Sequence, residues 1–144
     1  MKIRIINKSA FDLPQYETES AAGLDVRANT EETIVLKPLD RALVPTGLYV
    51  EIPDGYEIQV RPRSGLAARN GISIVNSPGT IDPDYRGEIK VILVNLSNDD
   101  FELKPGERIA QLVVAQFTKV EWEQVDILGE TSRGAGGFGS TGVK

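Results

Sequence analysis

Short apolar runs, interrupted by glycine and proline, make up the pattern of this chain. The clearest run alternates, with Tyr56, Ile58 and Val60 facing one way and Glu57 and Gln59 facing the other. A period of two predicts a β-strand with one buried face. The segments expected as strands are 3–6, 24–28, 33–36, 42–44, 48–52, 56–60, 72–75, 88–95, 101–103 and 108–117.

One segment, residues 64–70, predicts a helix. Ser64 suits the N-cap position, the following residues favour helix, and Gly71 suits the position just past the end. Glycine and proline between short strands are typical of all-β proteins. We therefore expect an all-β domain, a distorted jelly roll or β-barrel with one short helix.

The last part of the chain differs from the rest. Residues 133–142 contain five glycines, and Phe138 is their one large apolar residue. Such a segment cannot form a core of its own, and we expect it to be flexible until something orders it. This divides the chain into a β domain, residues 1–126, and a C-terminal tail, residues 127–144.

The composition restricts the possible chemistry. The chain has neither Cys nor His, which removes thiol nucleophiles and the commonest general base. A base would then be a carboxylate, or less readily a Lys or Tyr, and a metal would be an oxygen-liganded ion such as Mg²⁺. The net charge of −5 argues against a general affinity for nucleic acid. The N-terminus shows neither a signal peptide nor a membrane span, so a cytoplasmic protein is expected.

Residues 61–65, Arg-Pro-Arg-Ser-Gly, directly precede and begin the predicted helix. The free N–H groups at a helix start, together with Arg63 and the Ser64 hydroxyl, suit an anion. An ordinary capped helix with solvent-facing arginines fits the same pattern, so the segment by itself leaves both interpretations open.

Residues 76–88 bring Asp82, Asp84 and Glu88 close together around a tight connection. In a chain without His, a general base would be sought here. Asp, Pro and Gly are also ordinary turn residues, and the spacing alone favours that simpler interpretation.

Two polar residues lie beside or within predicted strands. Asp25 could help to hold a metal, and Gln111 interrupts an apolar run. Both residues also suit a solvent-facing position.

The glycine-rich tail contains residue types that suit a nucleotide. Glycines let a backbone approach phosphates closely, Arg133 adds charge, Ser140 and Thr141 add hydroxyls, and Phe138 could stack on a base. A functionless flexible end needs none of these, so we favour a binding role.

Taken together, these segments resemble the trimeric all-β dUTPase family. The matching motifs, in the family's order, are AGLDVRA (22–28), RPRSGLA (61–67), NSPGTIDPDYRGEI (76–89), RIAQLVV (108–114) and RGAGGFGSTG (133–142). The resemblance implies a homotrimer whose sites are shared between chains. It also implies hydrolysis of dUTP to dUMP and pyrophosphate, which removes dUTP and supplies dUMP for thymidylate synthesis.

The resemblance also implies roles for individual residues. Asp82 would orient or activate the attacking water, and Asp25 would hold Mg²⁺ through its coordinated waters. Pro83 follows Asp82 where a small residue is commoner in the family. The remaining residues implied to contact substrate, several of them through a hairpin pocket, are Arg63, Ser64, Gly65, Asn76, Thr80, Ile81, Tyr85, Lys90, Gln111, Arg133, Phe138, Gly139, Ser140 and Thr141.

Two alternatives remain open at this point. A dCTP deaminase of the same fold would carry a different hairpin and lack the Phe-bearing tail. A non-catalytic trimeric module, a nucleotide sensor or structural protein, would have no need of Asp82 as a base.

Overall fold

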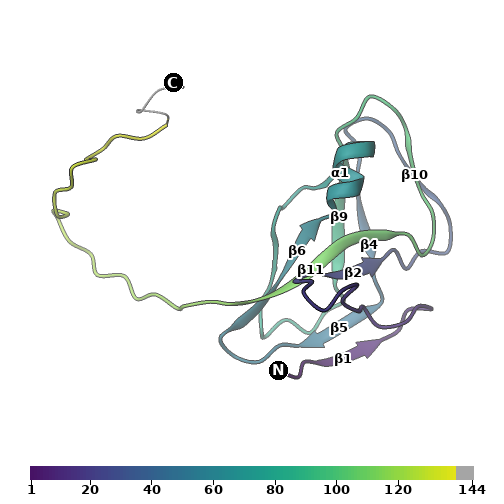
Figure 1. Cartoon of the computed structure of the whole chain (residues 1–144), viewed down its shortest axis with the longest axis horizontal. Coiled ribbons are helices and arrows are strands. Elements are labelled where there is room, and N and C mark those ends of the chain that lie inside the picture. The colour runs from purple at the N-terminus through teal and green to yellow at the C-terminus, as the bar shows by residue number, and fades with distance from the viewer. Residues whose placement is uncertain (139–144) are drawn as a thin grey trace.

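The computed structural model describes residues 1–138, which form eleven strands and one short helix (Figure 1). This confirms the all-β prediction. The strands are β1 (Arg4–Asn7), β2 (Leu24–Arg27), β3 (Ile34–Leu36), β4 (Arg41–Pro45), β5 (Leu48–Glu51), β6 (Tyr56–Pro62), β7 (Ile72–Ile74), β8 (Gly79–Ile81), β9 (Lys90–Asn95), β10 (Phe101–Leu103) and β11 (Arg108–Gln116), and the helix is α1 (Ser64–Asn70).

The strands pair antiparallel in four small sheets. The largest has the order β2-β11-β6-β8, and a second has the order β4-β9-β7. Strands β1 and β5 form one two-stranded sheet, and β10 and β3 form another. This arrangement agrees with a distorted jelly roll. The predicted β-barrel is not seen as one closed sheet within residues 1–138, because the hydrogen-bonded order breaks between these sheets.

The core lies between the sheets, as the alternating pattern predicts. Ile58 and Val60 of β6 are each 4% exposed, whereas Glu57 and Gln59 remain partly accessible on the other face. Each buried aliphatic side chain contributes about 1.5–3 kcal/mol, so strands of three to nine residues are held by this shared core. Its members that are at most 1% exposed are Val26, Ala28, Val44, Ile72, Ile89, Val91, Leu93, Leu103, Ile109 and Ala110.

Helix α1 has the predicted bounds but a different N-cap residue. Arg63, not Ser64, occupies the N-cap, with an extended backbone that continues directly from β6. Gly71 ends the helix in the left-handed conformation (φ 64°), where its N–H bonds the carbonyls of Ala67 and Leu66. Helix α1 has seven residues, and no helix within residues 1–138 is long and apolar enough to cross a membrane.

The connection 76–87 contains a strand that the sequence pattern missed. Strand β8 has three residues and pairs with β6, placing Thr80 opposite Gln59. The next strand, β9, pairs with β4 and β7 in another sheet. The predicted hairpin is therefore a crossing between two sheets, made by residues 82–89, which we call the crossing loop.

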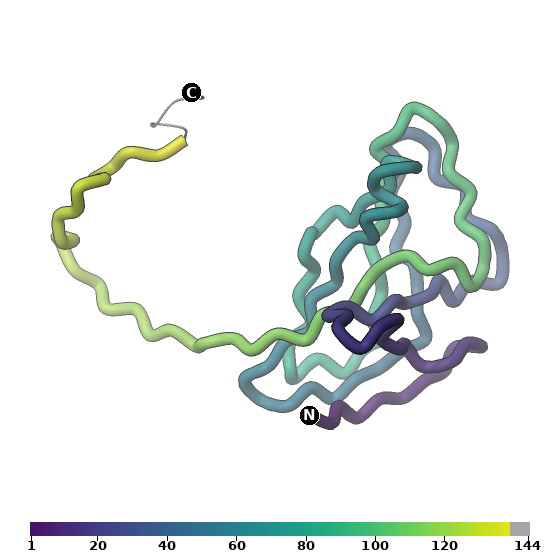
Figure 2. Tube along the Cα trace, in the orientation of Figure 1, coloured from purple at the N-terminus to yellow at the C-terminus, as the bar shows by residue number. Residues whose placement is uncertain are grey.

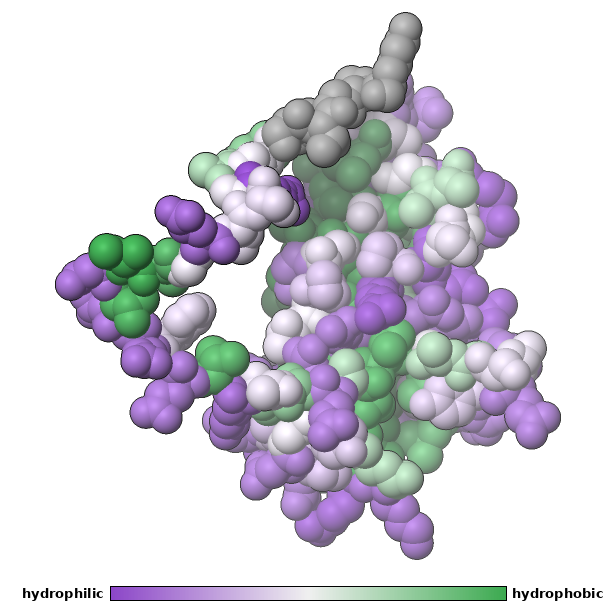
Figure 3. Space-filling view, turned by 60° about the vertical axis from the view of Figure 1, so that its left-hand side comes forward, coloured by the Kyte–Doolittle hydropathy of each residue, from purple (hydrophilic) through white to green (hydrophobic). Residues whose placement is uncertain are grey.

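Residues 118–138, which we call the arm, follow β11. Residues 118–135 are exposed throughout, and the chain here curves away from the strands (Figures 1 and 2). The arm includes Trp122, Ile127 and Leu128, which are 90%, 86% and 82% exposed. Apolar side chains stand out along it in Figure 3. The division of the chain at residue 126 stays a prediction.

Candidate active site

A groove of about 610 Å³ lies beside the crossing loop. Strands β4, β5, β8 and β9 and the loop itself contribute to its walls. The sequence-predicted substrate residues that line it are Thr80, Ile81, Asp82, Tyr85 and Lys90. The residues that sequence reasoning did not assign to this site are Leu43, Tyr49, Glu88, Ile89 and Ile92.

The crossing loop turns tightly after Asp82. The N–H of Tyr85 donates to the carbonyl of Asp82 (3.2 Å), and the Tyr85 hydroxyl donates to the carbonyl of Glu88 (3.0 Å). A β-carbon on Gly87 would overlap the Tyr85 hydroxyl oxygen, so only glycine lets the phenol ring fold back in this way. Arg86 donates from Nη1 to the carbonyls of Pro83 (2.6 Å) and Tyr85 (3.0 Å), which secures the outer side of the turn.

The Asp82 carboxylate is exposed at the groove. Within residues 1–138 it accepts no hydrogen bond and forms no ion pair. A carboxylate in this state has all its acceptor positions available for a water molecule. The geometry is suitable for a base that orients a water beside a bound ligand.

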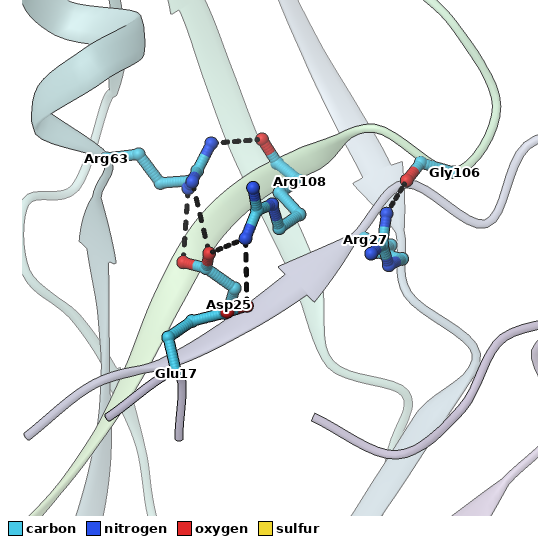
Figure 4. Close-up of polar contacts among 6 residues, drawn as sticks. All are labelled: Glu17, Asp25, Arg27, Arg63, Gly106 and Arg108. Atoms are coloured by element: carbon cyan, nitrogen blue, oxygen red, sulfur yellow. Dashed lines mark hydrogen bonds and ion pairs between the residues drawn. The ribbon is translucent and has the colours of Figure 1, made fainter. Parts of the chain in front are cut away.

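A second group of charged residues surrounds Asp25, whose side chain is 7% exposed (Figure 4). Arg63 donates to both carboxylate oxygens, from Nε to Oδ1 and from Nη2 to Oδ2, at 3.1 Å each. Arg108 Nη1 lies 3.1 Å from Asp25 Oδ2 and 2.9 Å from Glu17 Oε1. The positive charges of two guanidinium groups and the negative charges of two carboxylates thus balance one another next to the start of α1.

Arg63 retains donors beyond this pairing. Besides its two hydrogen bonds to Asp25, Arg63 donates a third from Nη1 to the carbonyl of Arg108 (3.4 Å). A guanidinium has five N–H groups. Two N–H groups therefore remain for another anion. Ser64 and Gly65 follow in the first helical turn, where the first intrahelical bond is Ala67 N–H to Arg63 carbonyl (3.0 Å). The N–H groups before Ala67 have no partner inside the helix.

Gln111 belongs with this second group. It lies opposite Asp25 in the pairing of β11 with β2, and opposite Arg61 in the pairing with β6. A β-carbon on Gly23 would come within 3.2 Å of the Gln111 side chain, so the glycine gives that side chain its space. Gln111 and Asp25 therefore face the same side of the sheet.

Three further predicted residues, Asn76, Arg133 and Phe138, do not line the groove. Asn76 precedes β8, and its Nδ2 would be 3.0 Å from a β-carbon on Gly79. Arg133 donates from Nε to the carbonyl of Gly136 within the arm (2.7 Å), and Phe138 is fully exposed. Gly139, Ser140 and Thr141 lie outside the described residues. The groove is lined by none of the second group and by no arm residue.

Sequence signals existed for some of the residues that were missed. Arg108 begins the motif RIAQLVV and could have been considered, whereas Glu88 was named among the clustered carboxylates but was given no contact with substrate. Leu43 and Tyr49 gave no signal, because they reach the groove from strands far from the crossing loop in sequence.

The fold and groove define a jelly-roll-like protein with an exposed carboxylate beside a polar groove and an arginine group at a helix start. The family model described as dUTPase matches residues 9–142. The chain is 54% identical to the deoxyuridine 5'-triphosphate nucleotidohydrolase of Finegoldia magna, over 99% of each chain. It is 56% identical to that of Fusobacterium nucleatum, over 99% of this chain and 97% of the relative. The chain therefore belongs to the dUTPase family.

Solved structures agree with this assignment. The Staphylococcus bacteriophage 80alpha dUTPase, in a structure described as holding dUPNHPP, aligns over 99% of both chains with a TM-score of 0.88 and 27% identity. The dUTPase of phage phi11 of S. aureus aligns over 90% of this chain and 100% of its own with a TM-score of 0.80. That structure is described as revealing a structural Mg(II) ion, and at 22% identity it supports the fold alone.

Asp25 and Glu17 allow a direct test of the charged group. We expect Asp25→Ala to lower the free energy of unfolding by about 2–3 kcal/mol, because it leaves the partly buried Arg63 guanidinium without a carboxylate and Arg108 with only the exposed Glu17. Glu17→Ala is the matched control. Its side chain is 66% exposed, so we expect a loss below about 1 kcal/mol. Denaturant unfolding of both variants measures this, and equal losses would contradict the prediction.

Proposed function

We propose that this chain hydrolyses dUTP to dUMP and pyrophosphate with Asp82 as the base. Family membership and the names of the relatives support the reaction and favour it over deamination or a purely structural role. One observation carries the assignment to residues. The groove is lined by Thr80, Tyr85 and Lys90 together with the exposed carboxylate of Asp82, which supports a site for a nucleotide beside an attacking water.

In the proposed reaction, Asp82 holds a water beside the α-phosphorus and accepts its proton. A bond forms between the water oxygen and the α-phosphorus, and the bond to the oxygen that bridges the α- and β-phosphorus breaks. Pyrophosphate leaves with the electron pair of that bond. Because a carboxylate is a modest base, most of the rate enhancement comes from positioning and from stabilisation of the developing charge.

The groove would hold the nucleoside. We assign the deoxyribose to the ring of Tyr85, where a 2'-hydroxyl would have no room. The uracil would lie against Thr80 and Ile81, with Lys90 beside it and Asn76 reading the edge of the base. Polar mismatch of this kind discriminates more strongly between bases than apolar contact does.

The second group would hold the triphosphate. The two uncommitted N–H groups of Arg63 and the unpaired backbone N–H groups of Ser64 and Gly65 suit phosphate oxygens, and Gln111 adds an amide donor. All these groups lie at one end of the sheet, near the start of α1.

Mg²⁺ is the proposed cofactor, and Asp25 fits a role in holding it through water. Within residues 1–138 no group of three or more acidic residues offers a complete metal site. Mg²⁺ usually keeps several waters and binds substrate phosphates beside one or two carboxylates. Asp25 Oδ1 accepts one described hydrogen bond, from Arg63 Nε, and so has acceptor capacity for a metal-bound water. When bound, the ion would neutralise phosphate charge.

We further propose that three copies assemble and share their sites. The groove, the second group around Asp25 and Arg63, and the arm are three separate parts of one chain. In this proposal a complete site needs all three. The exposed Trp122, Ile127 and Leu128 of the arm support its docking on another copy, since large apolar side chains gain by burial. Arg133 and Phe138–Thr141 would then close a site on a neighbouring copy.

We also propose that the protein acts in the cytoplasm.

A substrate panel tests the reaction. With Mg²⁺ present, we expect pyrophosphate release from dUTP and at most weak release from dCTP, dTTP and UTP, because the groove is proposed to read uracil and to exclude a 2'-hydroxyl. Ammonia release from dCTP would instead identify a deaminase. No turnover of dUTP would overturn the proposed function.

Substitution of the base gives a sharper test. We expect Asp82→Asn to reduce kcat about 100- to 10,000-fold, with KM for dUTP changing little, because the amide can bind water but cannot accept its proton. Asp84→Asn, also exposed in the crossing loop, is the control and should retain nearly normal turnover. Near-normal turnover of Asp82→Asn would remove Asp82 from the role of base.

Truncation tests the role of the tail. A chain ending at Ser132 should remain folded and associated but lose turnover by about 100-fold or more, because the groups that close the site are missing. A chain ending at Gly142 keeps the motif and serves as the control. Circular dichroism and light scattering monitor the fold and assembly. An unfolded product would show a structural role for the tail.

A further inference from the structure

Glu88 is a half-buried carboxylate at the wall of the groove that has no role in the proposed reaction. Its side chain is 18% exposed. Oε1 accepts the backbone N–H of Gly47 at 2.8 Å, and Oε2 lies 3.7 Å from the ammonium nitrogen of Lys90. One carboxylate therefore joins the turn between β4 and β5 to a cation that lines the groove.

The partner turn provides a rigid anchor. The hydroxyl of Thr46, a residue that is 2% exposed, donates to the carbonyl of Ile89 (2.6 Å), and the N–H of Ile89 donates to the carbonyl of Leu48 (2.8 Å). Gly47 has φ +71°, and a β-carbon there would come within 2.7 Å of the Ser9 nitrogen. The N–H that Glu88 accepts is thus fixed in position by its surroundings.

Residue 88 also reaches a second wall of the groove. Its carbonyl oxygen accepts the Tyr85 hydroxyl at 3.0 Å. The main chain of Glu88 thereby orients Tyr85, while its side chain forms an ion pair with Lys90. Both partners line the same groove as Asp82, so the position of residue 88 sets the shape of the groove on two sides.

We propose that Glu88 is a positioning residue that sets the affinity of the groove for its nucleotide by holding Lys90. The inference rests on the proposed function, since the nucleotide is dUTP. Lys90 has a long side chain that is 43% exposed, and without a partner it would sample many rotamers. Anchoring of Oε1 on Gly47 leaves Oε2 directed at Lys90, so the ammonium is held before the nucleotide binds.

The alternative is that Glu88 only stabilises the turn at Gly47. Glu88→Gln separates the two roles, because the amide oxygen can still accept the Gly47 N–H while the negative charge beside Lys90 is lost. Glu107→Gln is the matched control. Glu107 likewise accepts a backbone N–H across a turn, from Lys104 (3.0 Å), but it does not line the groove.

The experiment measures kcat and KM for dUTP, and the melting temperature, in the full-length chain. For Glu88→Gln we expect KM to rise about fivefold, the range of a partly exposed ion pair, with kcat within about twofold and an unchanged melting temperature. Glu107→Gln should match the unmodified chain. Combining Glu88→Gln with Lys90→Met should add nothing to the effect of Lys90→Met alone, because the charge then has no partner.

The possible outcomes separate the two proposals. An unchanged KM in Glu88→Gln, with normal turnover of the unmodified chain, would overturn the role of Glu88 and leave the proposed function intact. Additive effects with Lys90→Met, or a KM change that follows a loss of melting temperature, would also overturn it in favour of a structural role. Absence of dUTP turnover in the unmodified chain would overturn both.

Discussion

The hydrogen bond from the Thr46 hydroxyl to the Ile89 carbonyl joins the two sides of the groove. It is short (2.6 Å) and buried, and it connects the turn after β4 to the end of the crossing loop. A polar group left unpaired in such a place costs about 1–3 kcal/mol, so neither side can move away freely. Tyr85, Glu88 and Lys90 depend on this connection, because each is attached to the part of the chain that it holds.

The second group, around Asp25, is held together by ion pairs and not by a buried neutral hydrogen bond. There the carboxylate is almost fully buried while its two arginine partners remain partly exposed. The carboxylate satisfies one side of each guanidinium and leaves donors on the other side, where an anion can bind. Such a pairing orients the arginines before a ligand arrives, which reduces the side-chain entropy lost on binding. In the proposed site, Asp25 would thus support phosphate binding through Arg63 as well as through a metal-bound water.

The sequence predicted what depends on local pattern. Alternation at Ile58 and Val60 located β6, and the residues before Gly71 located the helix, because both signals lie within a few positions. Strand β8 was missed because its three residues sit among turn residues and gain their structure by pairing with β6. The contact of Arg63 with Asp25 spans 38 positions, and Tyr49 reaches the groove from another sheet, so neither follows from local pattern. The family resemblance nevertheless implied five residues of the groove, namely Thr80, Ile81, Asp82, Tyr85 and Lys90.

The arm carries the main structural argument for the proposed assembly of several copies. Its apolar side chains, Trp122, Ile127 and Leu128, would each gain by burial, yet all three are exposed. The domain already has a well-buried core of its own, so the arm is not needed to complete the fold. An exposed apolar segment that follows a finished domain supports the proposed docking on another copy. The same association would bring the glycine-rich end of one chain to the groove of another, so one contact would serve both assembly and catalysis.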